Sequence, residues 1–495
     1  MISVFYRLAF IILLCCYMVN LMAQDYYADL HVHTGKHFDF KHNESIPGSF
    51  VAHDYVVIDN IEFEGNSTTR QHILQRELTF SVGDTLSERE LSRMLERSRE
   101  NLLNTSLFNF VNVSLLFHEV LPVANVRFSF VERWYVWPFP IFEVAERNLH
   151  DWLMSPSFHR TNYGVYVVKE NFRGRMERIS FLARAGYRQN YSISYTIPYI
   201  NKAQTLGLGF SIGLNQRNEI EYLTKDNHQL FFSHDGRYAL RQFYINSRFS
   251  YRKGIHNTHH FIAEYNQFRF ADSLLVLNHL FSPGSETFSP FFSLGYEFKH
   301  DHRDIRAYPL TGHYFDLRLK RQGLGLLSNE DMDMTTAETS LRKFWKLDSR
   351  WFFATGVNAK TTFGNFKPYY MQQGLGFKGD IVRGYENFVI DGQHFLVFKN
   401  NFKYALIPNR INNIGFINSE KFSLIHYAVY LNFFTDAGYV RDGMFFNNNP
   451  YSNNLLIGFG MGIDLVTYYD KVFRFELSQT RQGDRGIHFH LIAPI

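Results

Sequence analysis

Hydrophobic and polar residues alternate with a period of two along most of the chain from Tyr163 to the C-terminus. In Leu206–Leu214, every even-numbered position is large and apolar and every odd-numbered position is Gly or Ser. The same alternation is found in residues 192–200, 314–320, 457–465 and 473–478. About sixteen such segments can be counted, with room in each for the ~9–11 residues of a tilted membrane strand. The pattern predicts a mainly β protein with an antiparallel β-barrel over residues 163–495.

A transmembrane barrel explains this pattern better than a large soluble β-sandwich or propeller. Charges recur on one face of the segments, as where Asp316, Arg318 and Lys320 alternate with apolar residues. No blade repeat of about 40 residues is visible. No segment after the N-terminal region offers about 18 consecutive apolar residues, which excludes a helical membrane protein. Because an open sheet edge in lipid leaves backbone groups unpaired, we expect the sheet to close.

The composition becomes informative once the alternation is known. The chain has 51 Phe, 30 Tyr and 5 Trp, and its formal net charge is only +4. These values exclude a disordered chain, a collagen-like chain and a strongly basic nucleic-acid-binding protein. Rings at alternate strand positions can face lipid without being buried in a soluble core. We expect the following side chains to point to lipid: Ile193, Tyr195, Leu208, Phe210, Phe459 and Phe475.

The N-terminus has the pattern of a secretory signal peptide over residues 1–23. Its apolar run, Leu8–Val19, is too short to span a bilayer as a helix. Both cysteines of the chain, Cys15 and Cys16, lie in this run. The mature chain is therefore expected to lack a disulfide, a thiolate metal site and a catalytic thiol. The His-rich residues 24–55 show no periodicity and are expected to form a flexible segment.

Residues 56–132 predict a small α/β unit of order β-α-α-β-β. A strand pattern starts at Val56 and ends before Gly65-Asn66. Ser87 and Glu90 have the spacing of a helix capping box, with leucines following at helical intervals. Two further strand patterns, 108–117 and 123–131, complete the unit. The aromatic residues 133–162 are expected to link this unit to the barrel.

One short string has the spacing of metal ligands. His31 and His33 would point to the same side of a strand, where imidazoles can bind a divalent metal. A metallohydrolase would need a full α/β barrel with further His and Asp ligands, and no such domain is present. We therefore expect no catalytic residues, no functional metal and no cofactor, and at most an adventitious metal site in the N-terminal segment.

The position of a second short motif suggests a structural role for it. Arg383, Gly384 and Tyr385 lie in a long connection between two predicted strands. Asp436 lies on a later strand, on the same face as Asn432, which would be the lumen. A connection that folds into the lumen would bring Arg383 to Asp436. Such a pair, shielded from water, would be a charge-assisted tether. The alternative is a solvated loop arginine and an ordinary lumen aspartate.

These motifs, in this order, carry a resemblance that covers residues 56–495. Ile61-Glu62-Phe63-Glu64-Gly65-Asn66, Gly83-Asp84 and Thr105-Ser106-Leu107-Phe108 resemble a POTRA domain. Ile381-Val382-Arg383-Gly384-Tyr385 and Phe434-Thr435-Asp436-Ala437-Gly438 resemble the BamA/TamA superfamily of outer-membrane assembly and translocation proteins. The resemblance implies a periplasmic POTRA domain followed by a 16-stranded antiparallel transmembrane barrel. It also implies a lumen loop in which Arg383, Gly384 and Tyr385 contact Asp436.

The functional expectation follows from this resemblance. The protein would insert or translocate other polypeptides at the bacterial outer membrane, possessing no enzymatic activity. The POTRA edge would recruit clients by β-augmentation. The first strand, near Tyr163–Glu170, and the last, near Ile487–Ala493, would pair weakly at a seam. Expected partners are outer-membrane lipid, client outer-membrane or secreted polypeptides and accessory lipoproteins, with no nucleic acid. The alternative is a closed pore or structural barrel without assembly activity.

The chain departs from the family pattern in two respects. A single POTRA unit is visible, whereas the main assembly factor of the family has several. The final strand ends in Ala493-Pro494-Ile495 and lacks the aromatic last residue that is usual for such barrels.

Overall fold

The computed structural model describes residues 55–495, except 119–120, 145–160, 235–237, 365–366, 378–379, 416–419, 445–448 and 493–495. The predicted signal peptide and, apart from Tyr55, the His-rich segment with His31 and His33 lie outside the described residues. Within the described part, no helix is long and apolar enough to cross a membrane.

Residues 56–132 form the expected small α/β unit around one sheet. The elements are β1 (Val56–Glu64), α2 (Gln71–Gln75), β2 (Thr85–Leu86), α3 (Glu88–Asn104), β3 (Phe108–Phe117) and β4 (Val123–Glu132). The sheet order is β2-β1-β4-β3, with β1 parallel to β4 and the other pairs antiparallel. The structure adds the two-residue strand β2, between the two helices, to the predicted β-α-α-β-β order.

Helix α3 begins where its sequence predicts. The Ser87 side chain accepts a hydrogen bond from the Glu90 backbone N–H, and Glu90 Oε2 accepts one from the Ser87 N–H at 3.1 Å. This reciprocal cap satisfies backbone donors that a helix start otherwise leaves unpaired. Behind the cap, Leu91 and Leu102 are buried in the core of the unit together with Phe128 of the sheet. The apolar face of α3 thus fixes the helix on the sheet.

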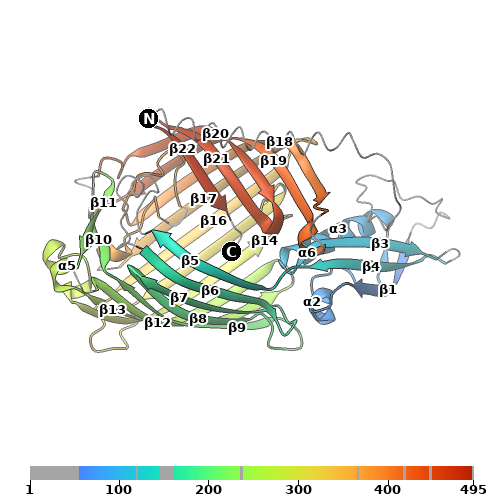
Figure 1. Ribbon diagram of the computed structural model, residues 1–495, viewed down its shortest axis with the longest axis horizontal. Coiled ribbons are helices and arrows are strands. Elements are labelled where there is room, and N and C mark those ends of the chain that lie inside the picture. Colours follow the sequence, from blue (N-terminus) through green and yellow to red (C-terminus); the bar gives the residue numbers. More distant parts are fainter. Residues whose placement is uncertain are drawn as a thin grey trace. The chain divides into compact units, whose positions relative to one another are not determined.

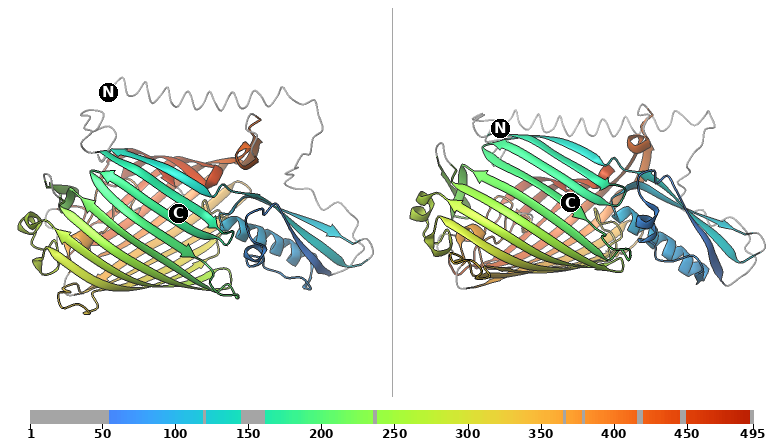
Figure 2. Two further views of the ribbon diagram at one scale, coloured as in Figure 1. Left: turned by 60° about the horizontal axis from the view of Figure 1, so that its bottom comes forward. Right: turned by 90° about the horizontal axis from the view of Figure 1, so that it is seen from below.

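The rest of the described chain is dominated by one 16-stranded antiparallel sheet that curves into a barrel (Figure 1). Its strands follow one another in sequence order, and Figure 2 shows them tilted around the barrel. They are β5 (Val136–Val144), β6 (Thr161–Phe172), β7 (Glu177–Gly186), β8 (Arg188–Ile197), β9 (Leu206–Arg217), β12 (Leu240–Lys253), β13 (Asn257–Phe270), β14 (Phe288–Asp301), β15 (Gly312–Gln322), β16 (Met334–Lys346), β17 (Trp351–Phe363), β18 (His394–Asn413), β19 (Leu424–Arg441), β20 (Leu455–Thr467), β21 (Lys471–Thr480) and β22 (Arg485–Ile492). The predicted fold class is confirmed.

Short elements occupy the connections between these strands. They are the separate hairpin β10 (Glu219–Lys225) and β11 (His228–Ser233), the helices α5 (Asp272–Leu277) and α6 (Glu420–Ser423), and the 3-10 turns η3 (Pro283–Ser285), η4 (Tyr369–Met371) and η6 (Tyr468–Asp470).

The barrel is apolar outside and polar inside. Of the six side chains expected to face lipid, Ile193, Phe210, Phe459 and Phe475 are exposed, while Tyr195 and Leu208 are half-buried on the same face. On the opposite face, Asp316, Asp464 and Glu476 are among the buried charged residues, as are Lys403 and Asp436. This arrangement is the reverse of a soluble protein and fits a surface that meets hydrocarbon.

The first strand of the sheet lies earlier than expected. β5 is contained in residues 133–162, which we expected to be a linker, and it pairs with β6 without a break from Val136↔Lys169 to Val144↔Thr161. The segment near Tyr163–Glu170 is therefore the second strand. Pro138 and Pro140 argue against a strand in the sequence, because proline lacks the N–H that an interior strand needs. An edge strand tolerates proline, since one side of its backbone has no partner strand.

Side chains of the N-terminal unit contact turns at one end of the barrel. The buried Glu77 carboxylate pairs with Arg252 of β12 at 2.6 Å. Asn104, at the end of α3, donates to the Asp304 carbonyl at 2.7 Å. Directly after the unit, Arg133 pairs with Asp470 of another turn at 2.6 Å. These contacts tie the unit to the turns that follow β12, β14 and β20.

Candidate functional site

A long connection between β17 and β18 packs inside the barrel. Tyr385 and Val382 of this connection are 2% and 1% exposed, in a cluster with Val397 of β18, Val440 of β19 and Leu456 of β20. The Tyr385 hydroxyl also donates to Gln482 Oε1. Apolar packing against three neighbouring strands therefore holds the connection, which we call the lumen loop (residues 364–393), against the barrel wall.

The lumen loop brings Arg383 and Asp436 together. Arg383 Nε donates to Asp436 Oδ2 at 2.8 Å, and its Nη2 donates to Oδ1 at 2.6 Å. The Arg383 backbone N–H is a third donor to the same carboxylate, at 3.2 Å. Arg383 is 5% exposed and Asp436 is fully buried. Two parallel bonds of this kind fix both distance and orientation, and burial strengthens the attraction between the charges.

Two further partners of Arg383 lie on strands that the sequence does not connect to it. Its Nη1 donates to Asn401 Oδ1 at 2.7 Å and lies 3.3 Å from Glu476 Oε1 on β21. The guanidinium also lies over the Phe434 ring, 3.9 Å from its centroid. Glu476 could have been suspected from its alternation with Phe475 and Leu477, which places it in the lumen. Nothing in the sequence pairs it with Arg383.

Glycines make room for this close approach. A Cβ atom built on Gly458 of β20 would lie 1.7 Å from the Arg383 carbonyl oxygen, and one on Gly438 of β19 would lie 2.3 Å from a Val382 methyl group. Gly384 itself has a φ of +101°, in a region that residues with a side chain rarely adopt. The tripeptide Arg383-Gly384-Tyr385 and the glycines of β19 and β20 are therefore parts of one packing arrangement.

Replacing Gly458 with alanine is expected to loosen the lumen loop. The added methyl group meets backbone, which cannot rotate away, and such overpacking costs about 1–3 kcal/mol. We expect tryptic cleavage after Arg383, followed by mass spectrometry on the folded protein, to become about tenfold faster as the open population rises. Gly415→Ala is the matched control, because nothing lies within 4 Å of a Cβ at Gly415. Equal cleavage rates in the two variants would contradict the assignment.

A second charged cluster lies in the lumen, closer to the N-terminal unit. The turn between β14 and β15 places Tyr308 with its hydroxyl donating to Asp464 Oδ2 at 2.7 Å. Arg474 binds the same carboxylate with two hydrogen bonds of 2.7 and 2.8 Å. Lys403 Nζ lies 3.9 Å from the centroid of the Tyr308 ring. A second segment, besides the lumen loop, is thus anchored to the strands β18, β20 and β21.

Two protein-family models match the chain. A family model described as the Omp85 superfamily domain matches residues 171–489, most of the barrel. The chain belongs to the Omp85 superfamily. A second model, POTRA, described as the surface antigen variable number repeat, matches residues 56–133. The α/β unit is therefore a POTRA domain, and this Omp85 protein is an outer-membrane type of barrel with a periplasmic N-terminal domain.

Solved structures share this architecture at low sequence identity. CdiB from Escherichia coli is 12% identical, with a TM-score of 0.51 over 88% of this chain and 76% of CdiB. BamA from Haemophilus ducreyi lacking POTRA domains 1-3 is 16% identical, with a TM-score of 0.48 over 88% of this chain and 84% of that one. No curated protein matches the sequence. The likeness to CdiB supports the fold, while activity has to be argued from the site.

Proposed function

We propose that this Omp85 protein inserts or translocates other polypeptides at the outer membrane. The observation that carries the proposal is the seam of the barrel. Among the described residues, β5 pairs only with β6 and β22 only with β21, so no backbone ladder joins the first and last strands. Unpaired strand edges seek partners, and a client strand can be such a partner.

The POTRA domain offers a second unpaired edge. β2 covers β1 only at Val56 and Val57, and the Ile58 carbonyl accepts from the Gly83 N–H. Beyond this point, no described strand pairs with residues 60–64 of β1 on the side opposite β4. An extended client segment could add to this edge by β-augmentation, and the groove that includes Phe63 and Arg127 could receive its side chains. We propose accessory lipoproteins as further partners of the protein.

The lumen contacts favour this function over that of an open pore. The lumen loop and the turn carrying Tyr308 are both anchored inside the barrel by buried ion pairs and hydrogen bonds. Both segments therefore occupy part of the lumen. The role that we propose for Arg383, Gly384, Tyr385 and Asp436 is to hold the lumen loop beside β20 and β21, next to the seam.

Depletion of the protein tests the proposed function. After depletion, quantitative proteomics of the outer-membrane fraction should show a several-fold loss of a defined set of barrel proteins, surface lipoproteins or secreted proteins. Re-expression of the wild-type chain should restore them. If all other outer-membrane and secreted proteins stayed at normal levels, the proposed function would fail, and the protein would be a closed pore or structural barrel without assembly activity.

A further inference from the structure

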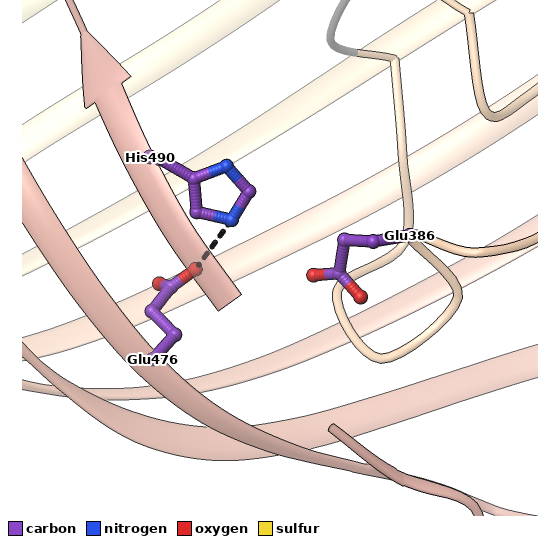
Figure 3. A group of neighbouring side chains, drawn as sticks. All are labelled: Glu386, Glu476 and His490. Carbon is purple, nitrogen blue, oxygen red and sulfur yellow. Dashed lines mark ion pairs between the residues drawn. The ribbon is translucent and has the colours of Figure 1, made fainter. Parts of the chain in front are cut away.

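A cluster of potential metal ligands lies where the lumen loop meets the last two strands. We propose that Glu386, Glu476 and His490 bind a divalent transition-metal cation, with zinc as the best match. Glu386 follows Arg383-Gly384-Tyr385 in the lumen loop, Glu476 lies on β21 and His490 on β22. One ligand atom from each lies within 4.8 Å of the others. Figure 3 shows the Glu386 carboxylate turned toward the other two side chains.

Burial leaves this cluster with polar atoms that have few partners outside it. The side chains of Glu386 and Glu476 are 9% and 1% exposed. Glu386 Oε1 is buried without a hydrogen-bond partner among the described residues, and the Nε2 atoms of His488 and His490 face only carboxylates of the same cluster, at 3.1 and 3.5 Å. A buried polar atom without a partner costs about 1–3 kcal/mol. A cation held between Glu386 Oε1 and the two imidazoles would supply the missing partner.

The charges around the cluster favour a cation. Two guanidiniums lie near Glu476, Arg383 at 3.3 Å and Arg474 at 3.7 Å, but each makes shorter bonds to an aspartate, Asp436 or Asp464. The ion pairs of the described residues give Glu386 no arginine or lysine partner, only His488 at 3.1 Å. The Glu386 charge is thus left without a permanent cationic partner in a buried site, where an unpaired charge is costly.

The ligand types favour zinc over magnesium or calcium. Imidazole nitrogens suit zinc and its neighbours, whereas magnesium and calcium prefer all-oxygen sites. His490 Nε2 lies 3.5 Å from Glu476 Oε2, close to the ~3.4 Å that separates two ligands in a tetrahedral site with bonds of about 2.1 Å. His488, two residues before His490 on the same face of β22, can supply a fourth ligand.

A metal at this position would join three separate segments of the chain. It would connect the lumen loop to β21 and to β22, which among the described residues pairs on one side only. The bound cation would thereby hold the loop against the C-terminal side of the seam. This site goes beyond the proposed handling of polypeptides and does not depend on it.

The test measures stabilisation of the barrel by zinc, because metal bound to the N-terminal histidines would not stabilise the barrel. The full-length protein in detergent is treated with EDTA, desalted and titrated with zinc chloride. The temperature at which the folded gel band converts to the unfolded band should rise by several degrees in the wild type. This rise should be lost in Glu386→Gln and in His490→Ala. Each variant's own folded band shows that it folds.

Matched variants and a second metal make the result specific. Glu338→Gln on β16 and His394→Ala on β18 change the same residue types away from the cluster and should keep the zinc-induced rise. Cobalt(II) should give visible absorption in the wild type that is reduced in Glu386→Gln. An equal zinc-induced rise in the wild type and Glu386→Gln would overturn the proposal, as would the absence of any rise in the wild type.

Discussion

Reversing the charge of Arg383 is expected to abolish the function of the protein in cells. Arg383→Asp would place a carboxylate against the buried carboxylates of Asp436 and Glu476, and removing one partner of a buried pair already costs about 3–5 kcal/mol. The lumen loop should detach from the barrel wall. A strain that depends on the protein, complemented with the variant, should resemble the depleted strain. Because the substitution removes the tryptic site at Arg383, opening of the loop should appear as rapid tryptic cleavage after Lys378.

The second substitution separates a direct pair from a general defect. Adding Asp436→Arg to Arg383→Asp should restore part of the function. Full recovery is not expected, because Glu476, Asn401 and Phe434 are arranged around a guanidinium that reaches in from the loop. Arg383→Lys should be intermediate, since an ammonium cannot make the two parallel bonds.

An exposed ion pair provides the control for these charge reversals. Arg321 and Asp333 pair at 2.6 Å with side chains 45% and 33% exposed. Such pairs contribute about 0–1 kcal/mol, so Arg321→Asp should leave complementation unchanged. A double variant at positions 383 and 436 that is as defective as the single variant would count against a direct tether.

The second large effect is expected at the seam, from the prolines of β5. The Tyr135 carbonyl accepts from the Glu170 N–H at 2.7 Å, so odd-numbered residues of this strand direct their backbone groups toward β6. Pro138 and Pro140 therefore have their nitrogen atoms on the seam side. The seam-side carbonyl of Val136 accepts a hydrogen bond from the Trp134 indole. The free edge of β5 is thus depleted in both donors and acceptors, which disfavours zipping to β22.

Replacing both prolines with valine should strengthen the seam and impair the function. The two new N–H groups would allow hydrogen bonds to β22, each contributing about 0.5–1.5 kcal/mol. The temperature of conversion between folded and unfolded gel bands should rise by several degrees. Complementation, measured through the levels of client proteins, should fall several-fold because fewer barrels open. If the barrel assembles no other polypeptide, the two substitutions should raise the conversion temperature without lowering the levels of other proteins.

The control for the prolines is a proline in an exposed turn. Pro450→Val changes the same residue type away from the seam and should change neither gel migration nor complementation. If the valine pair at positions 138 and 140 behaved like Pro450→Val in both assays, opening of the seam would not limit the function.

Much of the barrel could be predicted because neighbouring residues within each strand determine its two faces. In Leu206–Leu214, the large side chains and the glycines fall on opposite faces whatever the neighbouring strands are. The same rule placed Asp436 on the polar face. It failed at β5, where two prolines, which an edge strand tolerates, removed the usual signature of a strand. It also missed β2, because two residues cannot establish a period.

The contacts of the site depended on the three-dimensional path of the chain. The sequence by itself determined the alternating faces of the strands, the capped helix at Ser87 and the motif around Arg383. Only the tertiary structure decided that Arg383 meets Glu476, 93 residues away, that Glu386 faces His490, and that the seam falls beside Pro138. Alternation is a property of neighbouring residues in one strand. Partners across a barrel depend on strand register and on where a long loop enters, which no local pattern encodes.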